Sequence, residues 1–398
     1  MVLASAPRRL SPGVGNSNDQ TRRHNLSTVL TFLHHGGPQS RAQLTGLSAL
    51  NRSTTGALVA ELDELGLAYE TEPADSGRVG RPSPIVHANG KVVAITVNPD
   101  IDAVTVGIVG LGGLLHHLVR RETDAVPTVG ASIRIVQEIL EGMRDELQAE
   151  FRVAGVGIAV PGLVNSRDGV VALAPHLGWR DEPVAEPFAA ALGLRAAVAN
   201  DAALATVAES IFGAGRGVQD LVYLNGSASG IGGGVLAGGV MLRGSRGYAA
   251  ELGHTLVNSS GIRCHCGKRG CLETEVNLGL LLQVLGRDSA GLDEVDALIA
   301  AVPDARPEIE RQLDVLALAI GTFVSVFNPE SIILGGFLGS LYEADPARLR
   351  ASVEAASVVG LAEPVRLERA QLRSRLLTTG AAELVFADLL ADPAGTVF

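Results

Sequence analysis

Short apolar segments alternate with segments of helical periodicity along most of this 398-residue chain, beginning near Val92. The apolar segments have the length of β-strands and cover residues 92–97, 103–109, 153–160, 196–199, 221–224 and 332–334. Apolar side chains recur at helical spacing over residues 138–151, 183–192, 202–212 and 309–327. Glycine-rich turns follow several of the strands. This alternation predicts an α/β fold, in which small ligands bind beyond the strand ends.

The composition excludes several classes of protein. At 46% hydrophobic residues the chain is too apolar to be disordered, and its length predicts two or three domains. Its longest uncharged run, residues 221–242, is broken by polar residues and glycines, so we expect no transmembrane helix. The polar N-terminus lacks the apolar core of a signal peptide, so we expect a cytoplasmic protein with no membrane partner.

Charge is unevenly distributed along the chain. Residues 1–55 contain six arginines and one acidic residue, a balance of +5, whereas the whole chain carries −11 and the remainder therefore −16. A net negative chain does not bind nucleic acid over its whole surface. The basic segment alone is predicted to meet a polyanion.

The basic segment has the pattern of a winged helix-turn-helix. Apolar positions at helical spacing follow Asn25 and end before Gly36, and a capping box at Ser40 begins a second short helix. Asn51 can cap a third helix, which Gly66 ends. Two strands are then predicted at residues 68–71 and 84–87, around a basic, glycine-rich tip. The alternative is a small helical subdomain with an ordinary charged surface.

The third helix of such a motif enters the major groove of operator DNA, with its N-terminal residues at the base edges. Arg78 and Arg81 on the tip could reach phosphates or a narrow minor groove. The candidate DNA-binding residues are Arg41, Asn51, Arg52, Ser53, Thr54, Thr55, Arg78 and Arg81.

All three cysteines lie within eight residues: Cys264, Cys266 and Cys271. So few cysteines cannot form a disulfide framework, and their clustering predicts a metal site in a reducing compartment. A structural Zn²⁺ takes four protein ligands, often three cysteines and one histidine. His254 could fold in as the fourth, whereas His265 lies between two ligands and is expected to point away. The alternative is free buried cysteines.

The same region resembles the signature of the ROK family (repressors, open reading frames and sugar kinases). The matching residues are Gly253, His254, Gly261, Cys264, Cys266, Gly267, Gly270, Cys271 and Glu273. The N-terminal segment resembles that of the family's repressors, through Ser40-Arg41, Asn51-Arg52 and Gly80-Arg81-Pro82. The resemblance implies an actin-like, hexokinase-type fold of two α/β lobes behind a winged helix-turn-helix.

The resemblance also implies functional residues. It assigns one structural zinc ion per chain to His254, Cys264, Cys266 and Cys271, and sugar contacts to Asn200, Asp201, Glu251, His254 and Glu273. Carboxylates and amides suit adjacent sugar hydroxyls, and zinc on one nitrogen of His254 would leave the other for the sugar. In family kinases the residue that matches Asp201 is the general base. Otherwise, Glu251 and Glu273 would be surface carboxylates and Asn200-Asp201 a turn.

Two departures from the family pattern bear on activity. His176 stands in the sugar loop where an asparagine is usual. The first phosphate loop of the kinases, Asp-x-Gly-Gly-Thr, is replaced by residues 98–102, in which Pro99 lacks an N–H and Asp100 and Asp102 add negative charge. At about 4 Å each such repulsion costs roughly 4 kcal/mol at an effective dielectric of about 20. The second loop, residues 228–234, keeps its glycines. We therefore expect no kinase activity, with Asp201 a vestigial base and any nucleotide binding residual.

The predicted function is a DNA-binding transcriptional regulator that responds to a sugar or sugar phosphate, most simply a repressor of carbohydrate uptake or catabolism genes. We expect a homodimer or homotetramer on a near-palindromic operator. The domains are a flexible tail (1–20), the winged helix-turn-helix (21–90) and the sugar-binding domain (91–398). The alternatives are a ROK-type sugar kinase with an accessory DNA-binding segment, and a constitutive DNA-binding protein whose pocket is vestigial.

Overall fold

The computed structural model of the protein describes residues 18–72, 83–358 and 364–396. The chain divides into two compact units. The first unit contains the chain up to Asn200 and again from Leu377, and the second contains Asp201–Leu376. The chain therefore passes from one unit to the other twice.

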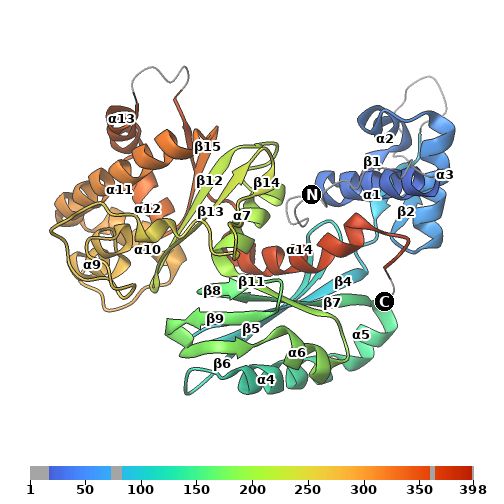
Figure 1. The fold of residues 1–398 in the computed structure, drawn as a ribbon, viewed down its shortest axis with the longest axis horizontal. Coiled ribbons are helices and arrows are strands. Elements are labelled where there is room, and N and C mark those ends of the chain that lie inside the picture. The colour runs from blue at the N-terminus through green and yellow to red at the C-terminus, as the bar shows by residue number, and fades with distance from the viewer. Residues whose placement is uncertain (1–17, 73–82, 359–363, 397–398) are drawn as a thin grey trace. The chain divides into compact units, whose positions relative to one another are not determined.

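The N-terminal part of the first unit, which we call the head, is a winged helix (Figure 1, blue). It consists of α1 (Asn18–Gly36), β1 (Gln39–Ser40), α2 (Arg41–Ser48), α3 (Arg52–Glu64), β2 (Ala68–Thr71) and β3 (Ile85–Ala88), and the strands pair in the order β1-β3-β2. The predicted capping box forms, because the Ser40 side chain accepts from the Gln43 N–H while Gln43 accepts from the Ser40 N–H. Asn51 caps α3 through the Thr54 N–H, also as predicted.

The rest of the first unit is an α/β lobe. Its main sheet, in the order β11-β7-β4-β5-β6, contains β4 (Val92–Pro99), β5 (Ala103–Gly110), β6 (Leu114–Glu122), β7 (Arg152–Val160) and β11 (Ala196–Asn200). A second sheet contains β8 (Leu163–Asn165), β9 (Val170–Ala174) and β10 (Trp179–Pro183), with the short helix η1 (Pro175–Leu177) between β9 and β10. The helices are α4 (Val129–Gly142), α5 (Arg144–Glu150), α6 (Ala185–Leu192) and the C-terminal α14 (Leu376–Ala391).

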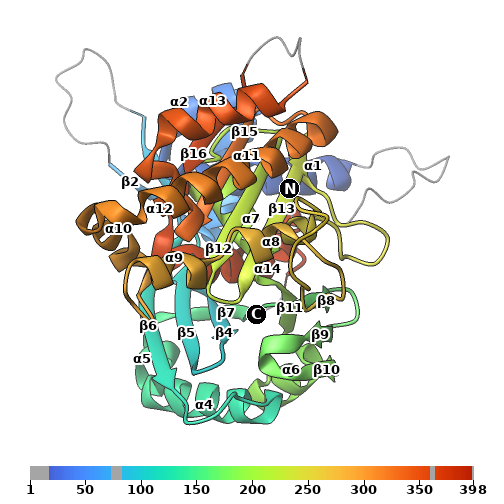
Figure 2. The same cartoon turned by 90° about the vertical axis from the view of Figure 1, so that its left-hand side faces the viewer.

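The second unit is also an α/β lobe. Its sheet, in the order β14-β13-β12-β15-β16, contains β12 (Leu221–Ser227), β13 (Gly230–Ala237), β14 (Val240–Met241), β15 (Ser331–Gly336) and β16 (Arg366–Arg369). Figure 2 shows its inserted helices in yellow and orange. The helical segments are α7 (Asp201–Phe212), η2 (Leu252–His254), α8 (Leu272–Glu275), α9 (Leu278–Val284), α10 (Leu292–Ala301), η3 (Pro303–Ala305), α11 (Arg306–Phe327), α12 (Phe337–Ala344), α13 (Pro346–Ala356) and η4 (Arg373–Arg375).

The two main sheets share one topology. In each, the first three strands are antiparallel neighbours, and the fourth and fifth lie parallel to the first, on its other side. Each unit thus repeats the strand order 3-2-1-4-5. The alternation seen in the sequence is therefore that of two α/β lobes built on the same plan.

The α-helix that follows the last strand of each main sheet belongs to the other unit. The helix α7 follows β11 of the first unit but is part of the second, and α14 follows β16 of the second unit but packs on the first. Backbone contact between α14 and β7 is close, because a Cβ on Gly157 would lie 2.0 Å from the Ala381 carbonyl oxygen. Only glycine at this position permits that approach.

Three apolar cores support the fold. One lies in the second unit and one in the lobe of the first unit. The third joins the head to the lobe, since Leu26, Leu30 and Leu33 of α1 are packed in the same cluster as Phe386 and Leu389 of α14. The head is thus held to the lobe by a shared core.

Two helices differ from prediction. The helix predicted over residues 138–151 begins earlier, at Val129, where the Thr128 side chain caps it, and is interrupted at Met143 before α5. The helix α1 begins at Asn18, inside the predicted tail. Within the described residues, no helix is long and apolar enough to cross a membrane.

Candidate functional site

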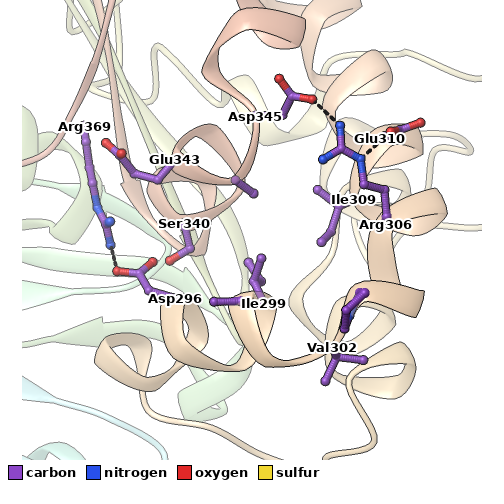
Figure 3. Close-up of a pocket in the computed structure, with 13 residues that line it drawn as sticks. Asp296, Ile299, Val302, Arg306, Ile309, Glu310, Ser340, Glu343, Asp345 and Arg369 are labelled. Atoms are coloured by element: carbon purple, nitrogen blue, oxygen red, sulfur yellow. Dashed lines mark hydrogen bonds and ion pairs between the residues drawn. The ribbon is translucent and has the colours of Figure 1, made fainter.

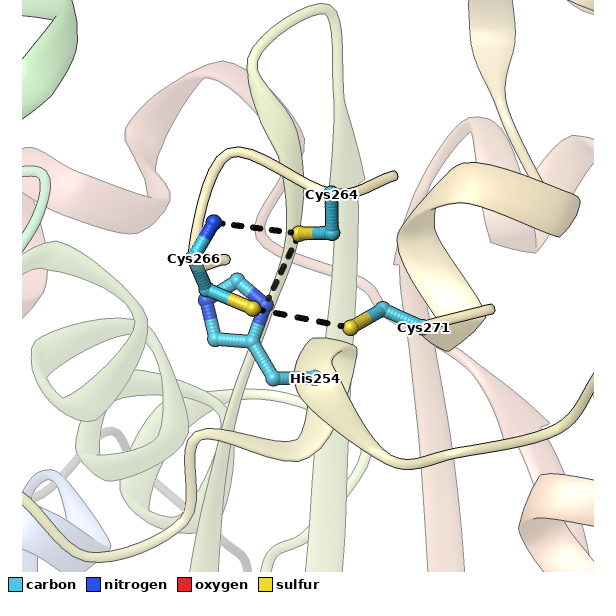
Figure 4. A group of neighbouring side chains, drawn as sticks. All are labelled: His254, Cys264, Cys266 and Cys271. Carbon is cyan, nitrogen blue, oxygen red and sulfur yellow. Dashed lines mark hydrogen bonds between the residues drawn. The ribbon is translucent and has the colours of Figure 1, made fainter. Parts of the chain in front are cut away.

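The cysteine loop brings all three thiols together in the second unit (Figure 4). Cys264 and Cys271 are buried and Cys266 is exposed. The Sγ atoms of Cys266 and Cys271 lie 3.6 Å apart, and the Cys266 N–H lies 3.4 Å from Cys264 Sγ. The loop turns back tightly at Gly270 (φ +66°), where a Cβ would lie 1.5 Å from the Asn258 carbonyl oxygen.

His254 is the histidine that completes this cluster. Its Nδ1 lies 3.6 Å from Cys264 Sγ, and the four ligand atoms of His254 and the cysteines all lie within 4.8 Å of one another. His265 does not point away as we expected. Its Nδ1 lies 3.2 Å from Glu273 Oε1 and 3.9 Å from Cys264 Sγ, with its ring edge-on to that of His254.

The donor set fits zinc. Tetrahedral thiolate ligands at about 2.3 Å from Zn²⁺ are about 3.8 Å apart, close to the 3.6 Å separations between Cys266 and Cys271 and between Cys264 and His254. Burial lowers the pKa of His254 and keeps its ring neutral, as a ligand must be. Although burial opposes it, hydrogen bonds from the Lys268 backbone and the neighbouring thiols lower the pKa of Cys266.

Carboxylates surround the histidine. Glu273 is buried on α8, with Oε1 3.0 Å from Cys264 Sγ and 3.3 Å from His254 Nδ1. Glu251 Oε2 lies 3.9 Å from the other histidine nitrogen, Nε2. His254 Nδ1 thus faces the thiols, while Nε2 faces the side on which Glu251 lies.

The charges of Asp201 and Glu273 both act on the carboxyl group of Glu251. Burial raises the pKa of Glu251, and the negative charges of Asp201 and Glu273 raise it further. Asp201 is the first residue of α7, where its Oδ1 accepts the Ala202 N–H at 2.8 Å. A carboxylate that has its pKa raised by burial and by neighbouring carboxylates is typical of a site that binds a ligand with hydroxyl donors.

The two remaining predicted sugar residues belong to the first unit. Asn200 ends β11 and donates from Nδ2 to the Gly162 carbonyl oxygen at 2.9 Å. His176 is exposed on η1. Each unit thus carries part of the predicted sugar-binding set.

The two phosphate-loop positions are both hairpin turns. Asp100 and Asp102 lie in the turn between β4 and β5, where the Asp100 N–H donates to the Ala103 carbonyl and Asp102 pairs with Arg120 at 2.8 Å. Arg120 therefore offsets part of the charge that we expected to repel phosphate. In the second unit, the turn between β12 and β13 ends at Gly230 (φ +139°), where a Cβ would lie 2.4 Å from Glu273 Oε2.

Several candidate DNA-binding residues also have structural roles. Arg41 donates through Nε and Nη2 to the Glu70 carboxylate, each at 2.5 Å. Asn51 is the N-cap of α3, and Thr55 is buried with its hydroxyl bonded to the Asn51 carbonyl. The contacts of Asn51 with Thr54 and Thr55 fix the first turn of α3.

The start of α3 nevertheless presents an exposed polar edge. Arg52 and Ser53 are exposed and Thr54 is partly so. Arg78 and Arg81 lie outside the described residues. The Arg41–Glu70 pair, which joins α2 to β2, has no local signal in the sequence because its members are 29 residues apart.

The second unit also contains a cavity of about 580 Å³ between α10, α11 and α12 (Figure 3). Its charged groups pair with one another, as Asp296 does with Arg369 and Arg306 with Glu310, both at 2.7 Å. None of the residues that we predicted to bind metal or sugar lines this cavity.

Comparison with known proteins matches most of the two lobes, including the cysteine loop, to one family. The model of the ROK family matches residues 116–388. A putative xylose repressor from Caldicellulosiruptor sp. (strain Rt8B.4) is 27% identical over 394 residues, covering 92% of this chain and 96% of its own length. The chain therefore belongs to the ROK family.

Two solved structures show how the family shares this fold. A ROK family transcriptional regulator, a homologue of Escherichia coli Mlc, superposes with a TM-score of 0.77 at 24% identity, covering 93% of this chain and 97% of its own. A ROK glucokinase from Streptomyces griseus, in complex with glucose and AMPPNP, superposes with a TM-score of 0.62 at 26% identity, covering 73% of this chain and 98% of its own. The fold is thus the two-lobed, hexokinase-type fold preceded by a winged helix-turn-helix.

Proposed function

We propose that this protein is a sugar-responsive transcriptional repressor that binds operator DNA through its head. The observation that carries the proposal is the shared core between a winged helix and a ROK lobe. A head packed in this way is a permanent part of the molecule, so its state can depend on the lobes. Two relatives that cover 92% and 89% of the chain are named a putative xylose repressor and a xylose repressor, which supports the same assignment.

The sugar site is proposed at Asp201, Glu251, His254 and Glu273, which all belong to the second unit. Asn200 and His176 of the first unit stay predicted sugar contacts. Adjacent hydroxyls of a sugar would donate to these carboxylates. Glu273 accepts from Cys264 and faces His254, so it connects the metal ligands with the sugar residues. This arrangement supports a site in which the metal loop sets the position of the sugar-binding groups.

A zinc ion in this site would be held by His254, Cys264, Cys266 and Cys271, and would supply a fixed positive charge that orders the loop. Binding through Nδ1 of His254 would place the ring proton on Nε2, which is available to donate to a sugar oxygen. All four positions would be filled by protein, so the site is structural rather than hydrolytic.

Kinase activity is not proposed. In the segment that replaces the first phosphate loop, Pro99 ends β4 without an N–H donor, and Asp100 is exposed in the turn that follows. The alternative, a sugar kinase, is favoured by Asp201, which stands at the start of α7 next to Glu251, as a base for a sugar hydroxyl would. The protein is further proposed to act in the cytoplasm as a homodimer or homotetramer, with the head near residues 21–90 and the sugar-binding domain after it.

Electrophoretic mobility shift with DNA from upstream of the protein's own coding region tests the proposal. We expect a specific shift that D-xylose or D-glucose changes at least tenfold in apparent Kd, and Arg52→Ala should weaken the shift. ADP release with either sugar and ATP, at a rate typical of kinases, would establish the alternative instead. No shift with any upstream fragment would refute the repressor assignment.

A further inference from the structure

The helix α14 lies at one of the two places where the chain passes between units. The second unit ends at Leu376 and the first resumes at Leu377, within the first turn of this helix. The other passage, from Asn200 to Asp201, begins α7. The chain therefore connects the two units through the first residues of these two helices.

A buried carboxylate joins α7 to the segment that leads into α14. Glu209 of α7 is fully buried, and its Oε1 accepts the N–H groups of Gln371 and Leu372 at 2.9 and 2.8 Å. Its Oε2 accepts the Ala214 N–H at 2.8 Å. The helix that begins with Asp201 is therefore bonded directly to the backbone that precedes α14.

A second buried carboxylate joins α14 to the head. Glu383 is 3% exposed, and its Oε1 lies 2.7 Å from Nε2 of His34, which is fully buried near the end of α1. The His34 Nδ1 accepts the Gly112 N–H, from the turn between β5 and β6, at 2.8 Å. Because Nδ1 accepts, Nε2 must carry the proton and donate it to Glu383.

The hydrogen bonds from Gly112 to His34 and from His34 to Glu383 form a link that we call the strap. They indicate a structural link rather than a metal site. The ligand atoms of His34, His35 and Glu383 lie close enough together to hold a cation. A cation on His34 Nε2 would displace the proton to Nδ1, which would then face the Gly112 N–H donor at 2.8 Å. The hydrogen bonds therefore oppose metal binding and fix the position of the proton on Nε2 of His34.

We propose that the Gly112–His34–Glu383 strap transmits the arrangement of the lobes to the DNA-binding head. This inference rests on the proposed function. A sugar at Asp201 acts on α7, Glu209 ties α7 to the start of α14, and Glu383 ties α14 to α1. His34 and Glu383 are positioning residues, since neither belongs to the predicted sugar or DNA contacts. The strap makes the position of α1 depend on α14 through directional bonds, which the surrounding apolar contacts alone would not do.

The test compares the zinc-loaded, full-length protein with Glu383→Gln, His34→Asn and the control Asp388→Asn. Asp388 lies on the same helix but pairs with Arg195 at the surface. Operator Kd is measured with and without D-xylose or D-glucose. We expect a change of at least tenfold for the wild type and the control, and less than twofold for the two strap variants, with direct sugar binding unchanged.

Hydrogen exchange of α1 amides gives a readout that does not need DNA. Sugar should change this exchange in the wild type and the control but not in Glu383→Gln, and circular dichroism should confirm that each variant is folded. A wild-type protein that ignores both sugars defeats the proposed function and with it this inference. A wild type and strap variants that respond equally leave the proposed function standing and overturn the strap alone.

Discussion

Two clusters in this molecule contain the same three side chains, a pair of histidines and a glutamate, and they differ in everything around them. His34, His35 and Glu383 lie between the head and α14, whereas His254, His265 and Glu273 lie beside three cysteines. In the first cluster, both ring nitrogens of His34 are committed to hydrogen bonds. In the second, Nδ1 of His254 faces the Sγ atom of Cys264, 3.6 Å away.

The comparison shows that residue types alone do not define a metal site. A histidine ligand needs a free lone pair aimed at the cation and a partner for its other nitrogen. His254 can meet both conditions with Cys264 on one side and Glu251 on the other. His34 cannot, because the Gly112 N–H occupies its acceptor and fixes the proton on Nε2.

Replacing one of the cysteine thiols should give the largest effect, a loss of bound zinc. In Cys266→Ser we expect the zinc content, measured by elemental analysis of purified protein, to fall from about one per chain to below a tenth. Glu383→Gln should retain the wild-type content. Equal zinc content in wild type and Cys266→Ser would show that this cluster does not bind the metal.

The next largest effect is the difference in zinc affinity between variants of the two histidines near the cysteines. We expect His254→Gln to weaken zinc binding about 100-fold, since it removes a ligand, and His265→Gln less than about threefold. Competition with a chromophoric chelator measures both. If the larger loss fell on His265, whose Nδ1 is 3.9 Å from Cys264 Sγ, the ligand assignment would have to be exchanged.

The buried Glu383 should make stability depend on acid. Burial alone would raise its pKa, but His34 and His35 more than offset this and bring the pKa to about 2, below the ordinary 4.5. A depressed pKa stabilises the folded state above pH 4.5, and this contribution, about 3 kcal/mol, is lost as the pH falls towards 2.

Urea unfolding between pH 7 and pH 3 measures this dependence. Glu383→Gln should lose part of the acid sensitivity and be about 2–3 kcal/mol less stable at pH 7. An identical pH dependence in the variant would show that Glu383 is not a paired, ionised carboxylate.

The smallest effect, a small change in thermal stability, is expected for a substitution of Glu251. Burial and the charges of Asp201 and Glu273 raise its pKa, so its ionisation opposes folding as the pH rises through that value. Because the side chain is 45% exposed, Glu251→Gln should raise the Tm of sugar-free protein by only about 1–3 °C at pH 7. The same variant should lose sugar binding, and a lower Tm would contradict the repulsion that we infer.

Local patterns in the sequence predicted much of this structure. The strand and helix periodicity predicted an α/β fold, the resemblance to the ROK family implied its two lobes, and Ser40 and Asn51 predicted the helix starts in the head. The spacing of Cys264, Cys266 and Cys271 predicted a cluster, which the structure forms. Each of these features depends on residues within a few turns of one another.

Contacts between distant segments could not be predicted in this way. His34 and Glu383 are 349 residues apart, and nothing local to either indicates the other. The same holds for Arg41 and Glu70. Arg41, a candidate DNA-binding residue, therefore also makes a structural ion pair within the head. Even the polar helix after Met143 was merged with its neighbour, because apolar spacing alone does not mark a break.

The core that α1 shares with Phe386 and Leu389 has a practical consequence for engineering. Excising residues 18–90 would separate the two halves of this shared core and expose apolar side chains to water on both fragments. Chimeras that exchange DNA specificity among such proteins should therefore carry the C-terminal helix along with the donor's winged helix.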